Sequence, residues 1–357
     1  MKKGIGVGIE DFKKIIEEDC YYFDKTNYIE ELLKDKTEIK LFTRPRRFGK
    51  TLNMTTLKYF FDVRNTEENR KLFKDLYIEK SEYFKEQGQY PTIFITLKDT
   101  KKNNWEECFS KIKIILRDLY GEHNYIKDKL SINEKEEYDK ILFKKDDAEY
   151  DNALLNLTKY LYNYYQKKVV LLIDEYDSPL ITANQFGYYK EAINFFRDFL
   201  SSALKTNSNL KMGVLTGIVQ VAKEGIFSGL NNVKTYNILG DKFETFFGLS
   251  EEEVENALKY FGMTYEIKEV KRWYDGYKFG NAEVYNPWSI INYLSDRGLQ
   301  AYWVNTSDNA LIYDNLKNST VDVFKDLEAL FEGKAIKKEI SPFFTFEELS
   351  KFDGIWQ

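Results

Sequence analysis

The stretch "RPRRFGKT", Arg44 to Thr51, ends like a phosphate-binding loop and begins unlike one. Its last three residues, Gly49, Lys50 and Thr51, fit the motif GxxxxGK(S/T). In that motif backbone N–H groups surround the phosphates, the lysine reaches the β- and γ-phosphates, and the hydroxyl ligates Mg²⁺. Arg44 stands where the first glycine of the motif belongs, so the departure affects the start of the turn and leaves the main phosphate and metal contacts intact.

The residues on either side place this stretch between a strand and a helix. "EIKLFT", residues 38–43, alternates and ends apolar, as a strand does, and the segment after Gly49 has helical spacing at Leu52, Leu57 and Phe60. A phosphate loop requires this context, because the N-terminus of the following helix adds the positive end of its dipole to the phosphate site.

Three further segments are typical of strands, with helical patterns between them: 92–97 ("TIFITL"), 169–174 ("VVLLID") and 210–216 ("LKMGVLT"). Strands that alternate with helices predict an α/β fold with a mostly parallel sheet covered on both faces. In the segment at 169–174, five apolar residues are followed at once by "DEYD". Asp174 and Glu175 are therefore expected at the carboxyl edge of the sheet, where ligands bind in such folds.

Two acids at the end of a buried strand, after a GKT loop, are what a Mg-dependent nucleotide hydrolase needs. We expect Asp174 to hold Mg²⁺ through its water shell, opposite Thr51, and Glu175 to polarise the attacking water as a general base. The alternative is that both acids only cap the next segment or lie in solvent at the strand end. Asp177 either orients a water near the metal or caps a turn or helix.

Other charged and polar residues extend this candidate site. Thr216 closes the fourth predicted strand, so its hydroxyl either senses the γ-phosphate or bonds a neighbouring carbonyl. Arg44, Arg46 and Arg47 form a positive group beside Lys50, suited to phosphate oxygens or to a partner's carboxylate. The three arginines cannot all face one nucleotide.

Composition excludes several other classes of protein. The formal net charge is -5, with no basic tail that would argue for DNA binding. The only cysteines are Cys20 and Cys108 and the only histidine is His123, so neither a disulfide framework nor a zinc cluster nor a histidine-based triad is expected. We expect His123 at the surface. Because no segment resembles a signal peptide or a membrane span, the sequence predicts a cytoplasmic protein.

Several long blocks of the sequence carry a resemblance to a known family. The blocks are "YYFDKTNYIEELL", "FTRPRRFGKTLNMTTLKYFF", "VVLLIDEYDSPL", "TGIVQVAKEGIFSGLNN" and "WYDGYKFGNAEVYNPWSIINYL". In these the chain resembles the bacterial predicted AAA-ATPase-like family, P-loop proteins often fused to a C-terminal nuclease-like domain of the PD-(D/E)XK type. The usual loop of that family starts Arg-Pro-Arg-Arg-Phe-Gly-Lys, so Arg44 resembles a family variant.

The resemblance implies a P-loop NTPase three-layer sandwich with an extra strand between the phosphate-loop strand and the acid-bearing strand. A mainly helical, winged-helix-like region is expected to follow. The implied divisions are an N-terminal helical segment packed on the core (1–36), a P-loop ATPase core (37–245) and a C-terminal region that stops before a further domain (246–357). No nuclease motif is visible in this chain.

The resemblance also implies roles for single residues. We expect nucleotide contacts from the loop residues Arg44, Arg46, Arg47, Phe48, Gly49, Lys50 and Thr51. Metal roles are implied for Thr51 and Asp174, and catalytic roles for Lys50 and Glu175. The segment that starts at Thr216 and includes Lys223 is implied to sense the nucleotide.

Two features of the C-terminal half bear on activity and partners. Gln220 stands where many relatives carry an arginine in a "TGxxR" pattern, and its neutral side chain is expected to leave nucleotide binding intact and to slow hydrolysis. The aromatic block from Trp273 to Phe279, with Pro287 and Trp288, forms either the core of a second domain or a platform for a partner.

The sequence therefore supports an ATP-binding protein whose Mg-dependent, slow hydrolysis drives or gates a conformational change. One alternative is a nucleotide-gated binding module with negligible hydrolysis. Another is a small-molecule kinase, for which no acceptor pocket is defined. The expected partners are the nucleotide and a protein partner or second copy of the chain. Nucleic acid enters only by analogy with relatives, and no membrane is expected.

Overall fold

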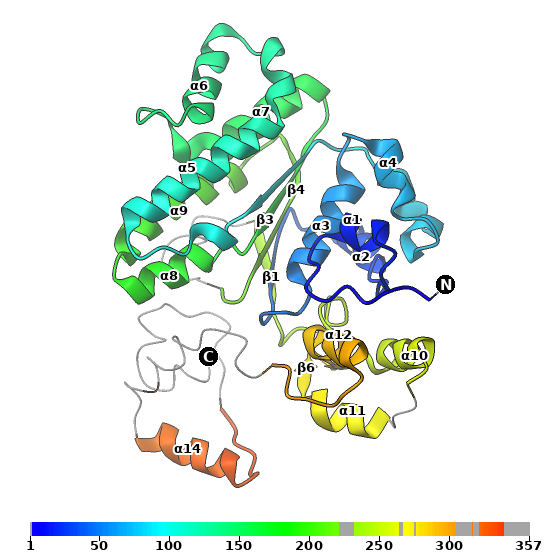
Figure 1. Cartoon of the computed structure of the whole chain (residues 1–357). Helices are drawn as coiled ribbons and strands as arrows, with labels where there is room; N and C mark the ends of the chain where they lie inside the picture. The colour runs from blue at the N-terminus through cyan, green and yellow to red at the C-terminus, as the bar shows by residue number, and fades with distance from the viewer. Residues whose placement is uncertain are drawn as a thin grey trace.

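The computed structural model describes residues 2–220, 232–263, 267–274, 276–303, 316 and 321–338. Its centre is a parallel sheet of five strands in the order β2-β3-β4-β1-β5 (Figure 1). The strands are β1 (Ile39–Thr43), β2 (Thr92–Thr96), β3 (Val169–Asp174), β4 (Leu210–Gly217) and β5 (Val233–Tyr236). All residues of β1 and β3 are buried, as expected for central strands covered on both faces.

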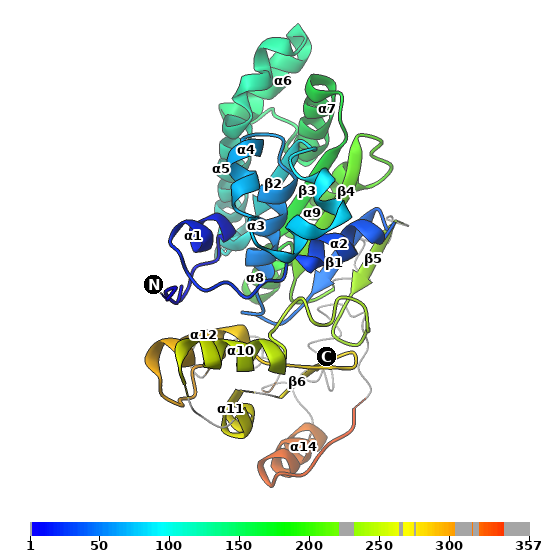
Figure 2. The same cartoon turned by 90° about the vertical axis from the view of Figure 1, so that its right-hand side faces the viewer.

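Helices cover both faces of the sheet (Figures 1 and 2). One face carries α1 (Phe12–Glu17), α2 (Asn27–Lys34), α3 (Lys50–Phe61) and α4 (Thr66–Lys71). The other carries α5 (Trp105–Glu122), α6 (Ile132–Leu142), α7 (Ala153–Tyr165), α8 (Ser178–Phe186) and α9 (Tyr189–Leu204). Short 3₁₀ turns join them: η1 (Tyr77–Lys80), η2 (Glu82–Glu86), η3 (Lys98–Thr100), η4 (Asn124–Lys129) and η5 (Tyr150–Asn152).

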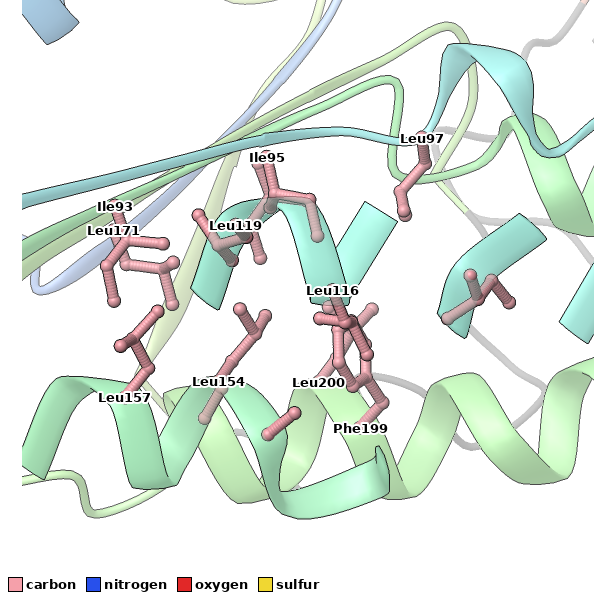
Figure 3. Packing of buried hydrophobic residues seen from close by; sticks show 14 of the residues in the cluster. Ile93, Ile95, Leu97, Leu116, Leu119, Leu154, Leu157, Leu171, Phe199 and Leu200 are labelled. Atoms are coloured by element: carbon pink, nitrogen blue, oxygen red, sulfur yellow. The ribbon is translucent and has the colours of Figure 1, made fainter. Parts of the chain in front are cut away.

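Alternation along the strands divides the core into two layers. Leu171 and Ile173 of β3 face the α5–α9 side, whereas Leu172 between them faces the α1–α3 side. Figure 3 shows the first layer, in which strand residues meet leucines of α5 and α7 and aromatic and aliphatic side chains of α9. The labelled members include Ile93, Ile95, Leu116, Leu119, Leu154, Leu157, Phe199 and Leu200.

A second, mainly helical region follows the sheet. Its elements are α10 (Glu251–Phe261), α11 (Ile267–Tyr274), the antiparallel hairpin β6 (Tyr277–Phe279) and β7 (Ala282–Val284), α12 (Pro287–Asp296) and α14 (Val321–Phe331). Ser250 begins α10 with a capping box to Glu253, and Asn286 caps α12 ahead of Pro287. Val254, Leu258 and Ile290 belong to a separate apolar core that joins α10 to α12.

The expected architecture is confirmed. All four strands predicted from the sequence are present within about one residue of their expected bounds, and β4 lies between the strand before the loop and the acid-bearing strand. The sequence did not predict β5, because its four residues, "VKTY", have no apolar run. In the described residues, no helix is both long enough and apolar enough to cross a bilayer.

The expectation that His123 lies at the surface is wrong. Its side chain is 1% exposed, with Nδ1 at 3.2 Å from the Tyr125 hydroxyl. Burial, together with the positive charges of Arg64 and Lys58, lowers its pKa to about 3. A neutral imidazole with an aromatic neighbour therefore serves as packing volume at this position.

Candidate functional site

The loop between β1 and α3 has the backbone of a phosphate cradle. Gly49 is the N-cap of α3 at φ 74°, in the left-handed region, and a Cβ built there would meet nothing within 4 Å. Conformation rather than space therefore requires glycine here. Helix α3 begins at Lys50, so the unpaired N–H groups of its first turn and the positive end of its dipole lie at the loop.

The Lys50 side chain lies along the inside of this loop. Its ammonium donates hydrogen bonds to the carbonyl oxygens of Arg44 (3.0 Å) and Pro45 (2.7 Å). Burial lowers the pKa of Lys50, while the carboxylates of Asp177, Glu175 and Asp174 oppose this shift. A buried ammonium held by carbonyl oxygens is well placed to exchange them for phosphate oxygens, which carry full negative charge.

Asp174, at the end of β3, joins the loop to the neighbouring strand. Its Oδ2 accepts a hydrogen bond from the Thr51 hydroxyl (2.9 Å), and its Oδ1 accepts one from the Thr216 hydroxyl (2.5 Å). Burial raises the pKa of Asp174, and the two hydroxyl bonds oppose this effect. The strand order explains the meeting, since β4 pairs with both β1 and β3. Thr216 therefore bonds the carboxylate of Asp174, and not the neighbouring carbonyl that one alternative suggested.

The donor set suits Mg²⁺. A threonine hydroxyl and a carboxylate are hard oxygen donors, which this cation prefers, and Mg²⁺ is usually held by one or two protein groups together with waters and substrate phosphates. Thr51 and Asp174 provide such a pair. Elsewhere in the described part of the chain, no cluster of three or more histidine, cysteine or acidic side chains could hold a metal by itself.

Glu175 follows in a strained conformation. Its φ is 51°, which costs a residue with a Cβ about 1–2 kcal/mol. The half-buried carboxylate accepts a hydrogen bond from the Ser178 hydroxyl (2.8 Å), and the backbone N–H points to the Thr216 hydroxyl at 3.4 Å. Strain of this kind is concentrated at functional sites, where the surroundings hold a side chain in an otherwise unfavourable place.

Asp177 has a role that neither sequence interpretation anticipated. It is the N-cap residue of α8, yet its side chain makes no capping bond. Its buried Oδ2 instead accepts the backbone N–H groups of Ile218 (2.7 Å) and Val219 (2.9 Å), which follow β4. Burial raises the pKa of Asp177 to about 6, and those N–H groups and Lys50 oppose the shift. Asp177 therefore fixes the chain just beyond Thr216.

Gly217 permits this arrangement. A Cβ at this position would lie 2.9 Å from Cγ of Asp177 and 2.7 Å from the ring of Tyr176. The Tyr176 hydroxyl also donates to the Val219 carbonyl (2.8 Å), which adds a second tie between the two segments. The signal in the sequence was the glycine directly after Thr216, because glycine at a strand end often marks a close approach.

Arg44, which the sequence predicted as a nucleotide contact, is buried in this structure. Its fully buried guanidinium donates to the carbonyl oxygens of Thr43 (2.9 Å), Tyr236 (2.7 Å) and Phe243 (3.2 Å). It also lies over the rings of Phe247 and Phe279. Burial lowers its pKa to about 10, so the side chain stays charged at neutral pH. Arg44 therefore joins the loop to the chain around β5.

The other two arginines have different surroundings. The Arg47 guanidinium lies over the Trp288 ring, 4.2 Å from its centroid, and Phe48 is fully buried against β6. These two side chains contact the C-terminal region. Arg46 is half-buried, and among the described residues its side chain has no hydrogen-bond or ion-pair partner. Of the three arginines, Arg46 is the one whose surroundings fit a phosphate contact.

Two residues of the predicted sensing segment stand apart. Lys223 lies outside the described residues. Gln220 is half-buried, and its Oε1 has no hydrogen-bond partner in the part of the chain that the structure describes. Of the site residues predicted from the sequence, the structure brings together Lys50, Thr51, Asp174, Glu175 and Thr216.

The chain is similar in sequence to a known protein. An uncharacterized protein encoded in the vnfD 5′ region of Azotobacter chroococcum mcd 1 is 25% identical over 317 residues, which are 88% of this chain and 56% of that protein. The chain thus spans little more than half the length of this relative.

The family model described as predicted AAA-ATPase matches residues 6–227, a range that contains the loop, the acid-bearing strand and Thr216. A match to this family indicates nucleotide binding. This chain belongs to the predicted AAA-ATPase family.

Proposed function

We propose that the chain binds Mg-ATP at the carboxyl edge of the sheet and hydrolyses it slowly to drive a conformational change. The observation that carries this proposal is the hydrogen bond between Thr51 and Asp174. It joins the end of the loop, with Lys50, to the end of β3, which Glu175 directly follows. A loop that ends at a helix N-terminus, with an acid-bearing strand beside it, supplies both the positive charge and the metal ligands that phosphoryl transfer needs.

Each residue has a distinct task in this proposal. Lys50 binds the β- and γ-phosphates, and Thr51 and Asp174 hold Mg²⁺, which neutralises charge that develops on the phosphate oxygens. Glu175 orients the attacking water and accepts its proton. Thr216 holds Asp174 in position through the hydrogen bond between their side chains. The sensing role of Lys223 remains a prediction.

An apolar pocket beside the loop supports nucleotide binding, because it offers a place for the base. Gly49 and Leu52 line it on one side, and it is formed further by the N-terminal segment and the C-terminal region, including Ile5, Ile9, Phe246, Phe261 and Leu294. Binding pockets for flat organic groups are mostly apolar with few polar groups, and Lys25 and Asn53 are such groups here. We assign the adenine base to this pocket, next to phosphates held at the loop.

A nucleotide switch with negligible hydrolysis is the second candidate. The observation that favours it is Gln220, whose neutral side chain stands close to the segment that Asp177 fixes. Without a cation at that position, the charge of the transition state is less stabilised and turnover falls. Nucleotide binding does not require that cation, so the two candidates share every binding residue and differ only in turnover.

Phosphate release over hours distinguishes the two candidates. For a slow ATPase, the wild-type chain with Mg-ATP releases phosphate above the buffer blank, and Glu175→Gln abolishes the release while retaining affinity. A switch binds ATP and releases no more than the blank. Phosphate release that persists undiminished in Glu175→Gln would exclude the general-base role.

A further inference from the structure

The C-terminal region contacts the phosphate loop directly, at the two residues that precede Gly49. The side chains of Arg47 and Phe48 make these contacts, and their partners lie about 230 to 260 positions later in the chain. No other segment of the described structure places aromatic rings on both side chains.

Arg47 is held by two tryptophans. Its guanidinium carbon lies 4.2 Å from the centroid of the Trp288 ring and 5.7 Å from that of Trp303. The Trp288 indole N–H donates to the Tyr302 carbonyl (3.1 Å), which ties the first tryptophan to the segment that carries the second. A guanidinium stacked on tryptophan is among the stronger cation–π arrangements.

The backbone of Arg47 depends on such support. Its φ is 66°, a left-handed conformation that is unfavourable for a residue with a Cβ and persists only where the surroundings impose it. Two parts of the loop, at Arg47 and at Gly49, are thus left-handed, and only the second is glycine. The stacking on Trp288 is one contact that offsets the strain at the first.

Phe48 is held next to it. Its ring is fully buried, 5.1 Å from the ring of Phe279 and 4.9 Å from that of Tyr277, centroid to centroid. Gly248 closes the other side, since a Cβ there would lie 3.3 Å from the Phe48 ring and 3.0 Å from Val284. The residue directly before the glycine of the loop therefore has almost no freedom to move unless β6 moves with it.

We propose that Trp288 and Phe279 are positioning residues for the nucleotide: they hold Arg47 and Phe48, and thereby set the loop in the shape that receives phosphates. This inference rests on the proposed nucleotide site. The same contacts make the coupling reciprocal, because a ligand that favours one loop shape must also favour the matching placement of β6 and α12. The C-terminal region is then the part of the chain that responds to the nucleotide.

A purely structural role for the aromatic contacts predicts something different. In that case removal of Trp288 lowers stability and leaves the affinity of the folded protein for nucleotide unchanged. The matched control is Trp273, which lies in the same region on α11 and is 49% exposed. Its ring packs against Tyr274 of the same helix, away from Arg47 and Phe48, so its removal should change neither loop shape nor affinity.

The test is the dissociation constant of Mg-ATP for the full chain, measured by calorimetry for the wild type, Trp288→Ala, Trp288→Phe and Trp273→Ala. We expect Trp288→Ala to weaken binding about tenfold or more, Trp288→Phe to recover most of the loss by keeping a ring under Arg47, and Trp273→Ala to match the wild type. Equal affinity in Trp288→Ala and the wild type would overturn the inference while leaving the nucleotide site intact. A wild type that binds no nucleotide would overturn both.

Hydrogen exchange on the unmodified chain gives a second test that does not depend on variant folding. Addition of Mg-ATP should slow amide exchange in β6, which does not line the pocket assigned to the base, as well as in the loop. Helix α6, which lies far from the loop in both views, should be unchanged (Figures 1 and 2). Slower exchange confined to the loop, α3 and the pocket-lining helix α12, with β6 unaffected, would contradict the coupling.

Discussion

Thr51 and Asp174 are 123 positions apart in the chain, and their side chains meet at 2.9 Å, Oγ1 to Oδ2. The strand order β3-β4-β1 brings this about, because the parallel strands end at one edge and α3 starts directly above it. Thr216 completes the group from the strand between them. A hydroxyl and a carboxylate held together in this way, beside a lysine, are the basis of the proposed Mg-nucleotide site.

Thr51→Val should remove the Mg²⁺ dependence of nucleotide binding. Valine keeps the shape of threonine and loses the hydroxyl, so both the metal ligand and a hydrogen bond to a charged group disappear, a loss of about 1.5–3 kcal/mol. The expected result is roughly a 10- to 100-fold weaker affinity for Mg-ATP. Titration with ATP in Mg²⁺ and in EDTA measures it. Thr51→Ser is the control and should remain Mg-dependent; equal Mg²⁺ dependence in all three proteins would count against the assignment.

Gly49→Ala should weaken both folding and nucleotide binding, although there is room for the methyl group. The reason is φ 74°, where a Cβ costs about 1–2 kcal/mol. Gly49→Asn is the matched variant, since asparagine tolerates the left-handed region better than alanine. We expect urea midpoints to fall in the order wild type, Asn, Ala. An alanine variant as stable as the wild type would show that the loop adopts another conformation at Gly49.

Asp177→Asn should change the pH dependence of stability. The pKa of Asp177 is about 6 in the fold against an ordinary value of 3.8, so the folded state holds its proton to higher pH than the unfolded chain does. Stability therefore falls as pH rises from about 4 through about 6, by about 3 kcal/mol for this shift. Asparagine stays neutral and can still accept the N–H groups of Ile218 and Val219.

The measurement for Asp177 is the urea midpoint of both proteins at about pH 5 and about pH 7.5, on either side of the folded pKa. The stability of Asp177→Asn relative to the wild type should be greater at the higher pH, because only the wild type then carries a buried charge. Lys50 is the positive group that opposes the shift, so Lys50→Ala with Asp177 retained should lose more stability between the two pH values than the wild type does, and addition of Asp177→Asn should remove this extra loss. A stability difference that is the same at both pH values would refute the interpretation.

Leu52→Ala should separate base binding from phosphate binding. Leu52 lines the apolar pocket beside the loop, and truncation of its side chain reduces the apolar surface available to the base without removing a charge. We expect a severalfold weaker ATP affinity, at about 25 cal/mol for each Å² of apolar surface that the base no longer buries, and unchanged affinity for inorganic tripolyphosphate. Competition binding with ATP and with tripolyphosphate measures the two affinities in the wild type and in Leu52→Ala. If Leu52→Ala lowered the affinity for ATP and for tripolyphosphate equally, the base would not bind in this pocket.

Local patterns predicted the part of the site that follows from secondary structure. The GKT residues stand at the start of a helix, and the acids after "VVLLI" stand at the end of a strand. Once the sheet was predicted as parallel, both were expected at the same edge of the sheet. Asp177 was harder, because its partners are backbone N–H groups of residues 218 and 219, which no side-chain pattern marks.

The arginines show where sequence reasoning fails. A charged residue beside a phosphate motif is expected to face the ligand, yet Arg44 is buried on carbonyls and Arg47 is stacked on Trp288. Apart from the Thr43 carbonyl, their partners lie about 190 to 260 positions later in the chain and belong to no periodic pattern. The hydrogen bonds of Arg44 to the chain around β5, and the stacking of Arg47 on α12, show what these two side chains do in the loop.

The most direct test of the central claim is the equilibrium binding of Mg-ATP to the purified chain, by calorimetry, with Lys50→Ala and Glu175→Gln measured in parallel. The account predicts saturable binding to the wild type and to Glu175→Gln, and an affinity at least about tenfold weaker in Lys50→Ala, because its ammonium makes charge-assisted bonds to the phosphates. Absence of binding to the wild type, or equal affinity in Lys50→Ala, would contradict the assignment of the "RPRRFGKT" loop as a nucleotide site.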